Sequence, residues 1–346
     1  MPGSDTHEFD GRLLGLIQTR VPLLRQPWAQ IAAELGCDEQ KVLCRVKALR
    51  GEGGLIRQIC GIFDVTALGY HKALIAMALE PEKLDAAGAA AADHPGVSHC
   101  YGRTGRYNLW LTLATSPSSR LGPEKTAQAL AARCGASSCL LLPGRRRYKL
   151  NLRFNAFGDD TLLADAPCEP AGPTPDAAAT SLTDVQVRAV RALQLDLPAA
   201  PEPFTSPAEA MGLAADELLV HAADFLAAGL MRRYAALLDH RAAGAEANVL
   251  VVWRVAPADA DAAGAMCAQL PAVSHCYLRD TADDWPYGLY TMIHGRRRED
   301  CEATIRRIAA STGISDYMEL WTLKQYAKRC IRLFGEEESA WERAQV

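Results

Sequence analysis

The stretch VSHCY occurs twice in this sequence, at residues 97–101 and 273–277, and an arginine follows each copy at the same offset. Each copy therefore has a histidine, a tyrosine and an arginine at alternate positions: His99, Tyr101 and Arg103 in the first, and His275, Tyr277 and Arg279 in the second. Alternate residues of a β-strand share one face, so a strand at either position would present the three side chains together. A single copy would fit a solvated outer face or a histidine satisfied by core hydrogen bonds. The repetition favours a functional site.

The second copy has more side chains suited to chemistry than the first. The stretch that follows it adds three aromatic residues and a histidine: Trp285, Tyr287, Tyr290 and His294. The matching stretch of the first copy has Tyr107 and Trp110 but no histidine. Aromatic rings cover the faces of a flat ligand, guanidinium groups bind carboxylates in bidentate pairs, and imidazole moves a proton or ligates a metal. The set therefore favours a flat, anionic ligand, with the main site in the second copy.

Further cations are expected near the same strands. They are Arg57, Arg232, Arg233 and the run RRRYK at residues 145–149. A solvated, charged strand end explains the arginine runs as well as a binding role does.

The blocks around VSHCY are also repeated, in the same order. GLIRQ at 54–58 matches GLMRR at 229–233, and RYNLWLTL at 106–113 matches PYGLYTMI at 286–293. Self-similarity of this kind indicates duplication, and 346 residues are enough for two domain-sized copies. Between the copies, a stretch rich in proline, acidic and small residues predicts a flexible or extended linker at 157–180.

Each copy begins with a predicted helix-turn-helix. In the first, residues 28–36 and 38–50 have helical periodicity, Gly36 ends one helix, and Asp38 caps the next. GLIR then starts a small wing. In the second copy, residues 184–193 supply the first helix and residues 215–233 the last.

Strands and helices then alternate in the order βαββαβ, beginning at KALIAMAL (72–79) in the first copy and at NVLVVWRV (248–255) in the second. That order is typical of ferredoxin-like domains. The predicted fold class is α+β, a tandem duplication in which each half has a helix-turn-helix (winged-helix-like) domain and a ferredoxin-like domain. The predicted limits are 8–62 and 181–240 for the helix-turn-helix domains, and 63–156 and 241–335 for the ferredoxin-like domains.

The composition predicts a globular protein of the cytoplasm. Hydrophobic residues make up 49% and charged residues 23%, which is ordinary for such proteins. No apolar run approaches the roughly 20 residues that span a bilayer, and MPGSDTHEFD lacks the basic and apolar parts of a signal peptide. Eleven cysteines without a CxxC pair indicate reduced thiols and argue against a structural zinc site. The sequence also lacks a nucleotide fingerprint and a glycine-rich phosphate loop.

A helix-turn-helix followed by a ferredoxin-like domain resembles the Lrp/AsnC family of transcriptional regulators, which implies DNA binding. DNA affinity comes largely from Lys and Arg side chains that neutralise phosphates. The first recognition helix has Lys41, Arg45 and Lys47, which leaves the question open for that domain. Residues 192–231 contain several acids and neither Lys nor Arg, so the second helix-turn-helix is predicted to be a scaffold. The net charge of −4 adds no global attraction for nucleic acid.

The longer motifs GVSHCYGRTGRYNLWLTL (96–113) and AVSHCYLRDTADDWPYGLYTMIHG (272–295) resemble the two subunits of siroheme decarboxylases. In that family, Lrp-like modules catalyse decarboxylation instead of binding DNA. The resemblance covers residues 8–156 and 181–335 and implies the fused form of heme d1 biosynthesis. It implies a lyase that removes the carboxyl groups of the two acetate side chains of siroheme, giving 12,18-didecarboxysiroheme and carbon dioxide.

The resemblance and the residues together suggest roles. Loss of carbon dioxide leaves negative charge on a methylene carbon, and a proton must then be supplied. The candidate catalytic residues are His275, His294 and His99, and the candidate substrate-binding residues are Arg279, Tyr277, Trp285, Tyr287, Arg103, Tyr101, Arg57 and Arg232. Either His275 or His294 is expected to contact the iron of the substrate, and no cofactor beyond that iron is expected.

The main alternative is an Lrp/AsnC-type regulator that senses a tetrapyrrole or an amino acid, followed by a heme-binding protein without catalysis. The missing cations of the second recognition helix and the fusion of two copies count against a regulator. The expected partner is siroheme, with neither DNA nor a membrane. The two halves are expected to form a pseudo-dimer within one chain with their sheets facing each other, and a further homo-oligomer stays open.

Overall fold

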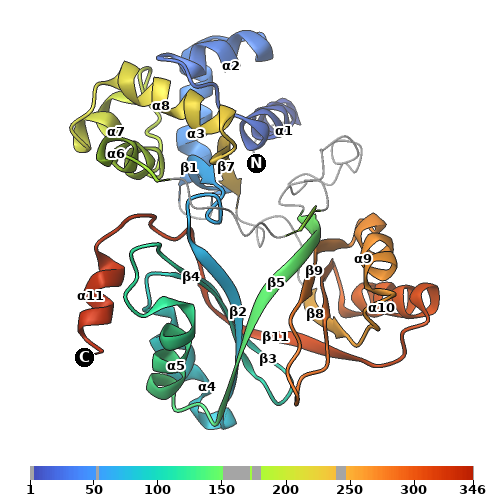
Figure 1. Cartoon of the computed structure of the whole chain (residues 1–346). Coiled ribbons are helices and arrows are strands. Elements are labelled where there is room, and N and C mark those ends of the chain that lie inside the picture. Colours follow the sequence, from blue (N-terminus) through green and yellow to red (C-terminus); the bar gives the residue numbers. More distant parts are fainter. Residues whose placement is uncertain (1–3, 52–53, 151–171, 174–180, 239–246, 346) are drawn as a thin grey trace. The chain divides into compact units, whose positions relative to one another are not determined.

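The computed structural model describes residues 4–51, 54–150, 172–173, 181–238 and 247–345 (Figure 1). These residues form two compact units, one with both helix-turn-helix segments and one with both ferredoxin-like segments. The predicted linker at 157–180 lies outside the described residues except for Gly172–Pro173. The domain limits inferred from the sequence stay predictions.

The first helix-turn-helix forms as its capping residues predict. Its helices are α1 (Ser4–Thr19), α2 (Pro27–Leu35) and α3 (Glu39–Arg50). Gly36 ends α2 with a left-handed φ of 68°, which glycine adopts without strain. The Asp38 carboxylate accepts the backbone N–H of Lys41 at 2.7 Å and so satisfies a free donor at the start of α3.

The second helix-turn-helix comprises α6 (Asp184–Leu193), α7 (Thr205–Ala210) and α8 (Ala215–Ala227). The predicted wing that starts at GLIR pairs with the second module. Strand β1 (Ile56–Phe63) pairs antiparallel with β7 (Met231–Leu238), so the first module pairs with the second instead of folding back on itself. The strands associate because both bury large apolar side chains, among them Ile56, Ile59, Phe63, Met231, Tyr234 and Leu238.

The ferredoxin-like unit confirms the predicted βαββαβ order in both copies. In the first copy the elements are β2 (His71–Ala78), α4 (Leu84–Ala92), β3 (Val97–Arg103), β4 (Leu109–Thr115), α5 (Gly122–Cys134) and β5 (Ser138–Leu150). In the second copy they are β8 (Ala247–Trp253), α9 (Ala260–Gln269), β9 (Val273–Arg279), β10 (Leu289–Gly295), α10 (Arg298–Thr312) and β11 (Tyr317–Lys328). The repeated VSHCY stretches are the equivalent strands β3 and β9.

The last strand of each copy joins the two sheets. The first half of β5 pairs with β2 of its own copy, and the second half pairs with β9 of the other copy. In the same way, β11 pairs first with β8 and then with β3. The strands follow the order β2-β4-β3-β11-β8-β10-β9-β5, and the β2–β5 pairing closes the ring. The two halves therefore share one closed set of strands, as the expected pseudo-dimer requires.

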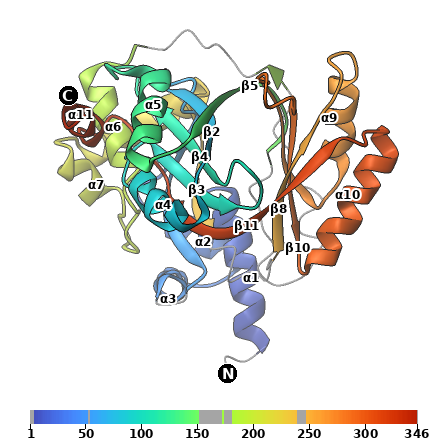
Figure 2. The same cartoon turned by 90° about the horizontal axis from the view of Figure 1, so that it is seen from below.

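Three hydrophobic clusters stabilise this unit. In both views α4 and α5 lie on one side of the strands, and α9 and α10 lie on the other (Figures 1 and 2). Each helix pair covers its own sheet with a separate cluster. A third cluster contains Ala76 and Trp110 of one sheet with Val252 and Tyr290 of the other. The inner faces of the two sheets therefore pack against each other.

Each exchanged strand places a tyrosine on a helix of the other copy. Tyr148 of β5 packs on Gly264 of α9, and its hydroxyl donates to Asp261 at 2.5 Å. Tyr326 of β11 packs on Gly88 of α4 in the same way, with its hydroxyl 2.6 Å from Asp85. A Cβ atom on either glycine would clash with the ring, so glycine permits the close approach.

The C-terminal segment continues past the predicted end of the second ferredoxin-like domain. Helix α11 (Glu337–Arg343) packs on the first copy, where the Trp341 ring lies 4.3 Å from the buried His94 ring. The Glu342 carboxylate accepts the backbone N–H of Arg120 at 3.1 Å. Within the described part of the chain, no helix has both the length and the apolar character needed to cross a membrane.

We predict that Gly264→Ala lowers the free energy of unfolding by roughly 1–3 kcal/mol, because the added methyl group displaces the Tyr148 ring. Urea denaturation measures the change. Gly15→Ala in α1 is the matched control, since a Cβ there meets nothing within 4 Å and helical alanine is favoured over glycine. Equal stability of Gly264→Ala and the unmodified protein would contradict the packing described for Tyr148.

Candidate active site

Strands β3 and β9 carry two nearly identical ladders of His, Tyr and Arg. In β3 the His99 and Tyr101 ring centroids are 6.3 Å apart with planes 28° apart, and the Arg103 guanidinium lies 5.1 Å from the Tyr101 ring. In β9 the corresponding values are 6.5 Å, 29° and 5.2 Å for His275, Tyr277 and Arg279. The predicted common face of each triplet is therefore present.

Strand alternation turns each ladder away from the helices. Cys100 and Cys276, one residue after each histidine, are fully buried in the helix-covered clusters of the two sheets. Their thiols lie near the backbone carbonyls of Gly88 in α4 and Gly264 in α9. The His, Tyr and Arg side chains therefore occupy the inner face, between the sheets.

The two ladder arginines reach the other copy of the module. Arg103 donates to the carbonyl of Leu320 at 3.1 Å and to the Thr322 hydroxyl at 2.8 Å, both on β11. Arg279 donates to the carbonyl of Leu142 on β5 at 2.9 Å. Burial lowers the pKa of Arg103 to about 10 and also lowers the pKa of Arg279. Both guanidinium groups stay charged at neutral pH, so each is a desolvated cation suited to an anion.

One serine hydroxyl connects the two histidines of the second copy. The Ser274 Oγ lies 2.7 Å from Nδ1 of His275 and 2.9 Å from Nε2 of His294. Ser98 makes the equivalent contact with His99 at 3.0 Å. Ser274 was not among the residues selected from the sequence, although its place inside the repeated VSHCY stretch was a signal. The contact forms a continuous polar chain that can pass a proton between two imidazoles.

The first copy lacks this chain because it has no residue equivalent to His294, the histidine of β10. Tyr277 pairs with Tyr290 on β10, and Tyr101 pairs with Trp110 on β4. Four residues after these partners stand His294 and Ala114 respectively. The ladders are alike, but their surroundings are chemically different.

His294 is neutral at physiological pH. Burial lowers its pKa to about 4, and the charges of Lys328 and Arg103 contribute to the same shift. Arg103 comes from the first copy and Lys328 from the second, so cations of both copies act on one imidazole. An anionic ligand bound beside these cations would offset their effect and raise the pKa of His294.

The aromatic residues selected from the sequence mainly pack between the sheets. Trp285 is only 3% exposed, and its ring lies 5.2 Å from Tyr107 and 5.6 Å from Trp110. Its indole N–H donates to the Tyr290 hydroxyl at 2.7 Å. Tyr287 packs beside the Trp285 ring at 5.1 Å. In the structure, Trp285 is a core residue joining the two copies.

Two of the candidate cations belong to the helix-turn-helix unit and not to the unit with the ladders. Arg57 is an exposed residue of β1, and Arg232 of β7 donates to Asp64 at 2.8 Å. The sequence could not reveal that Arg57 and Arg232 lie in a different unit from the ladders. That separation follows from the pairing of β1 with β7.

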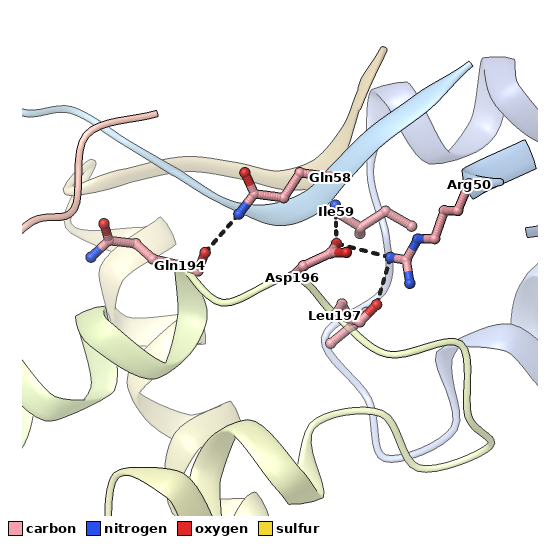
Figure 3. Close-up of polar contacts among 6 residues, drawn as sticks. All are labelled: Arg50, Gln58, Ile59, Gln194, Asp196 and Leu197. Atoms are coloured by element: carbon pink, nitrogen blue, oxygen red, sulfur yellow. Dashed lines mark hydrogen bonds and ion pairs between the residues drawn. The ribbon is translucent and has the colours of Figure 1, made fainter. Parts of the chain in front are cut away.

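Several cations of the helix-turn-helix unit make contacts within the chain. Arg50, at the end of α3, donates to Asp196 at 3.0 Å and to the carbonyl of Leu197, and Asp196 also accepts the backbone N–H of Ile59 at 2.8 Å (Figure 3). Beside them, Gln58 donates to the carbonyl of Gln194 at 2.9 Å (Figure 3). These contacts tie the first recognition helix and β1 to the segment after α6.

The middle of α3 is engaged as well. Arg45 makes a bidentate pair with Asp10 of α1, with N–O distances of 2.8 and 2.6 Å. The Lys41 ammonium lies 4.4 Å from the centroid of the Phe9 ring. Of the three cations that left DNA binding open, two therefore contact α1 of the same domain.

Comparison with known proteins identifies the family. The AsnC-like ligand binding domain matches residues 67–149 and 242–327, and the siroheme decarboxylase NirDL-like HTH domain matches residues 10–57. Siroheme decarboxylase of Hydrogenobacter thermophilus is 33% identical over 338 residues, which cover 97% of this chain and 97% of that protein. This chain belongs to the siroheme decarboxylase family.

Other siroheme decarboxylases agree with the tandem arrangement. The siroheme decarboxylase beta subunit of Methanosarcina barkeri is 36% identical over 151 residues, which cover 98% of that subunit but 44% of this chain. The crystal structure of the siroheme decarboxylase NirDL in complex with an iron-uroporphyrin III analogue is 29% identical, with a TM-score of 0.76 and 98% of each chain covered. The resemblance inferred from the sequence is confirmed, and the regulator alternative is set aside.

We predict that His294 makes the protein less stable as the pH falls from about 6.5 to about 4. The unfolded chain binds a proton at the ordinary histidine pKa of 6.5, whereas the folded chain resists it until about 4, so protonation favours unfolding in that window. His294→Asn removes the titrating group and keeps a polar side chain beside Ser274. Between pH 7 and pH 5, the unmodified protein should lose about 1–2 kcal/mol more unfolding free energy than the variant in urea titrations. Equal losses would contradict the low pKa.

Proposed function

We propose that this chain is a siroheme decarboxylase that removes the carboxyl groups of the two acetate side chains of siroheme. The products are 12,18-didecarboxysiroheme and carbon dioxide, and the reaction is a step of heme d1 biosynthesis. The observation that carries the proposal is the 33% identity with a siroheme decarboxylase over 97% of both chains. The two inner-face ladders of His, Tyr and Arg supply the chemistry.

The inner face suits an iron tetrapyrrole with many carboxylates. Arg103 and Arg279 are buried cations beside the tyrosine rings of their ladders. Desolvated guanidinium groups bind carboxylates strongly, and tyrosine rings pack against a flat macrocycle. The related NirDL structure contains an iron-uroporphyrin III analogue, which supports the same class of ligand here. The iron belongs to the substrate, and His275 or His294 contacts it; we propose no other cofactor.

The reaction needs no oxidant or reductant. The bond between the methylene carbon and the carboxylate breaks, carbon dioxide leaves, and the electron pair stays on the methylene carbon, where the macrocycle delocalises it. A proton then adds to that carbon and completes a methyl group. His275 and His294, connected through Ser274, supply and replace this proton. The substrate's carboxylates raise the pKa of His294 by offsetting Arg103 and Lys328, so binding prepares the donor.

The direct test is to incubate the purified protein anaerobically with siroheme and to follow the pigment by mass spectrometry. Loss of two carboxyl groups supports the proposal. Siroheme that is bound but recovered unchanged would instead identify a carrier or sensor and overturn it.

We predict that His275→Ala and His294→Ala each lower turnover roughly 100-fold or more, as loss of a proton donor does. His99→Ala should cost less, because Ala114 stands in the first copy where His294 stands in the second. His71→Ala, an exposed residue of β2, is the control and should retain full activity. If His99→Ala abolished turnover while both second-copy variants remained active, the first copy would be the working site.

We further propose that the protein does not bind a specific DNA operator at physiological salt. Arg45 and Arg50 are engaged inside the chain, and α8 has acidic residues and no cation. With both arginines of α3 engaged and no Lys or Arg in α8, the two recognition helices offer few cations to phosphates. A protected footprint on DNA upstream of the protein's own gene would contradict this.

The proposal also covers the compartment and the functional unit of the enzyme. The cysteines that the structure describes are all free, in keeping with the reducing cytoplasm. The functional unit is the pseudo-dimer within one chain, since each ladder arginine bonds to the other copy.

A further inference from the structure

The two ladders differ in the residues that stand beside them on the exchanged strands. On β11, Gln325 pairs with Tyr101 and Lys328 pairs with His99. On β5, Arg147 pairs with Tyr277 and Leu150 pairs with His275. Each ladder therefore has one additional cation, but Lys328 is level with a histidine, whereas Arg147 is level with a tyrosine.

Lys328 shares the inner face with His99. Residues that pair directly across antiparallel strands have their side chains on the same side of the sheet. The preceding residue, Ala327, pairs with Cys100 and is buried in the helix-covered cluster on the other side. Lys328 is half-buried, so part of its side chain is exposed to solvent.

The charge of Lys328 also acts on the histidine of the second copy. Its charge and that of Arg103 both lower the pKa of His294. Ser274 and His275 complete the surroundings of this imidazole on β9. Lys328 therefore stands level with His99 of the first copy, and its charge acts on His294 of the second.

We propose that Lys328 is a further substrate-binding residue, which holds a carboxylate that remains on the tetrapyrrole and so places the reacting acetate beside His294. The inference rests on the proposed function, since it assigns a role toward the same substrate.

The chemistry decides which carboxylate Lys328 holds. If the ammonium paired with the departing carboxylate, it would stabilise the substrate's ground state. The activation barrier to loss of carbon dioxide would then rise. An ammonium paired with a neighbouring carboxylate orients the macrocycle without that penalty. Lys328 therefore contacts a group that is present in both the substrate and the product.

The difference between Lys328 and Leu150 distinguishes the two ends of the inner face for a bound macrocycle. Leu150 occupies the equivalent position beside His275, and an apolar side chain offers a carboxylate nothing. A macrocycle between the sheets therefore has a preferred orientation, with a carboxylate at the Lys328 end of the inner face.

The test compares Lys328→Met with Lys328→Arg and with Lys324→Met. Lys324 lies on the same strand but is exposed and paired with Asp85 of α4 at 2.9 Å, so it controls for loss of a lysine from β11. The dissociation constants of siroheme and of its didecarboxylated product are measured anaerobically by absorbance titration. Urea denaturation of each variant verifies that it is folded.

Lys328→Met should weaken the binding of both pigments by roughly tenfold to a hundredfold, the worth of a hydrogen bond to a charged group. Lys328→Arg should restore most of the affinity, and Lys324→Met should bind both pigments as the unmodified protein does. Unchanged affinity of Lys328→Met would overturn the inference. So would a loss confined to siroheme, because Lys328 would then hold a departing carboxylate.

These outcomes are separable from failure of the proposed function. If the unmodified protein binds siroheme without converting it, the decarboxylase proposal fails. The affinities of Lys328→Met and Lys324→Met still decide whether Lys328 holds a carboxylate.

Discussion

The exchange of β5 and β11 between the two sheets is the constraint on which the rest of the ferredoxin-like unit depends. Each strand is long enough to pair with its own copy and then with the other. The exchange carries Tyr148 and Tyr326 onto the opposite helices. Neither copy could keep these hydrogen bonds alone, because half of a long strand would lose its partner.

The same exchange creates the chemical environment between the sheets. Arg103 ends a strand of the first copy but bonds to β11 of the second, and Arg279 does the converse on β5. Because both cations are buried, their charges act over several ångströms with little screening. Burial between the sheets lowers the pKa of His294, and the charges of Lys328 and Arg103, one from each copy, lower it further. The two copies differ in sequence beside the ladders, because Lys328 pairs with His99 where Leu150 pairs with His275.

Much of the fold was predictable because it follows from local signals. Alternation in VSHCY predicted the common face of His, Tyr and Arg, and Asp38 and Gly36 predicted the boundaries of two helices. The candidate site was less predictable. Trp285 was expected to face a ligand, but it packs among aromatic residues of both copies. Its surroundings depend on which faces meet, and spacing along the chain does not contain that information.

The sequence by itself determined the duplication, the fold class, the family and the two ladders, because each depends on residue order and on the two-residue period of a strand. Only the tertiary structure decided that the wings pair with each other, that Arg57 and Arg232 belong to a different unit from the ladders, and that Ser274 connects two histidines. These features arise from contacts between segments that are distant along the chain or lie on neighbouring strands. Strand register sets such contacts, and register is fixed by the burial of whole faces, which no short motif encodes.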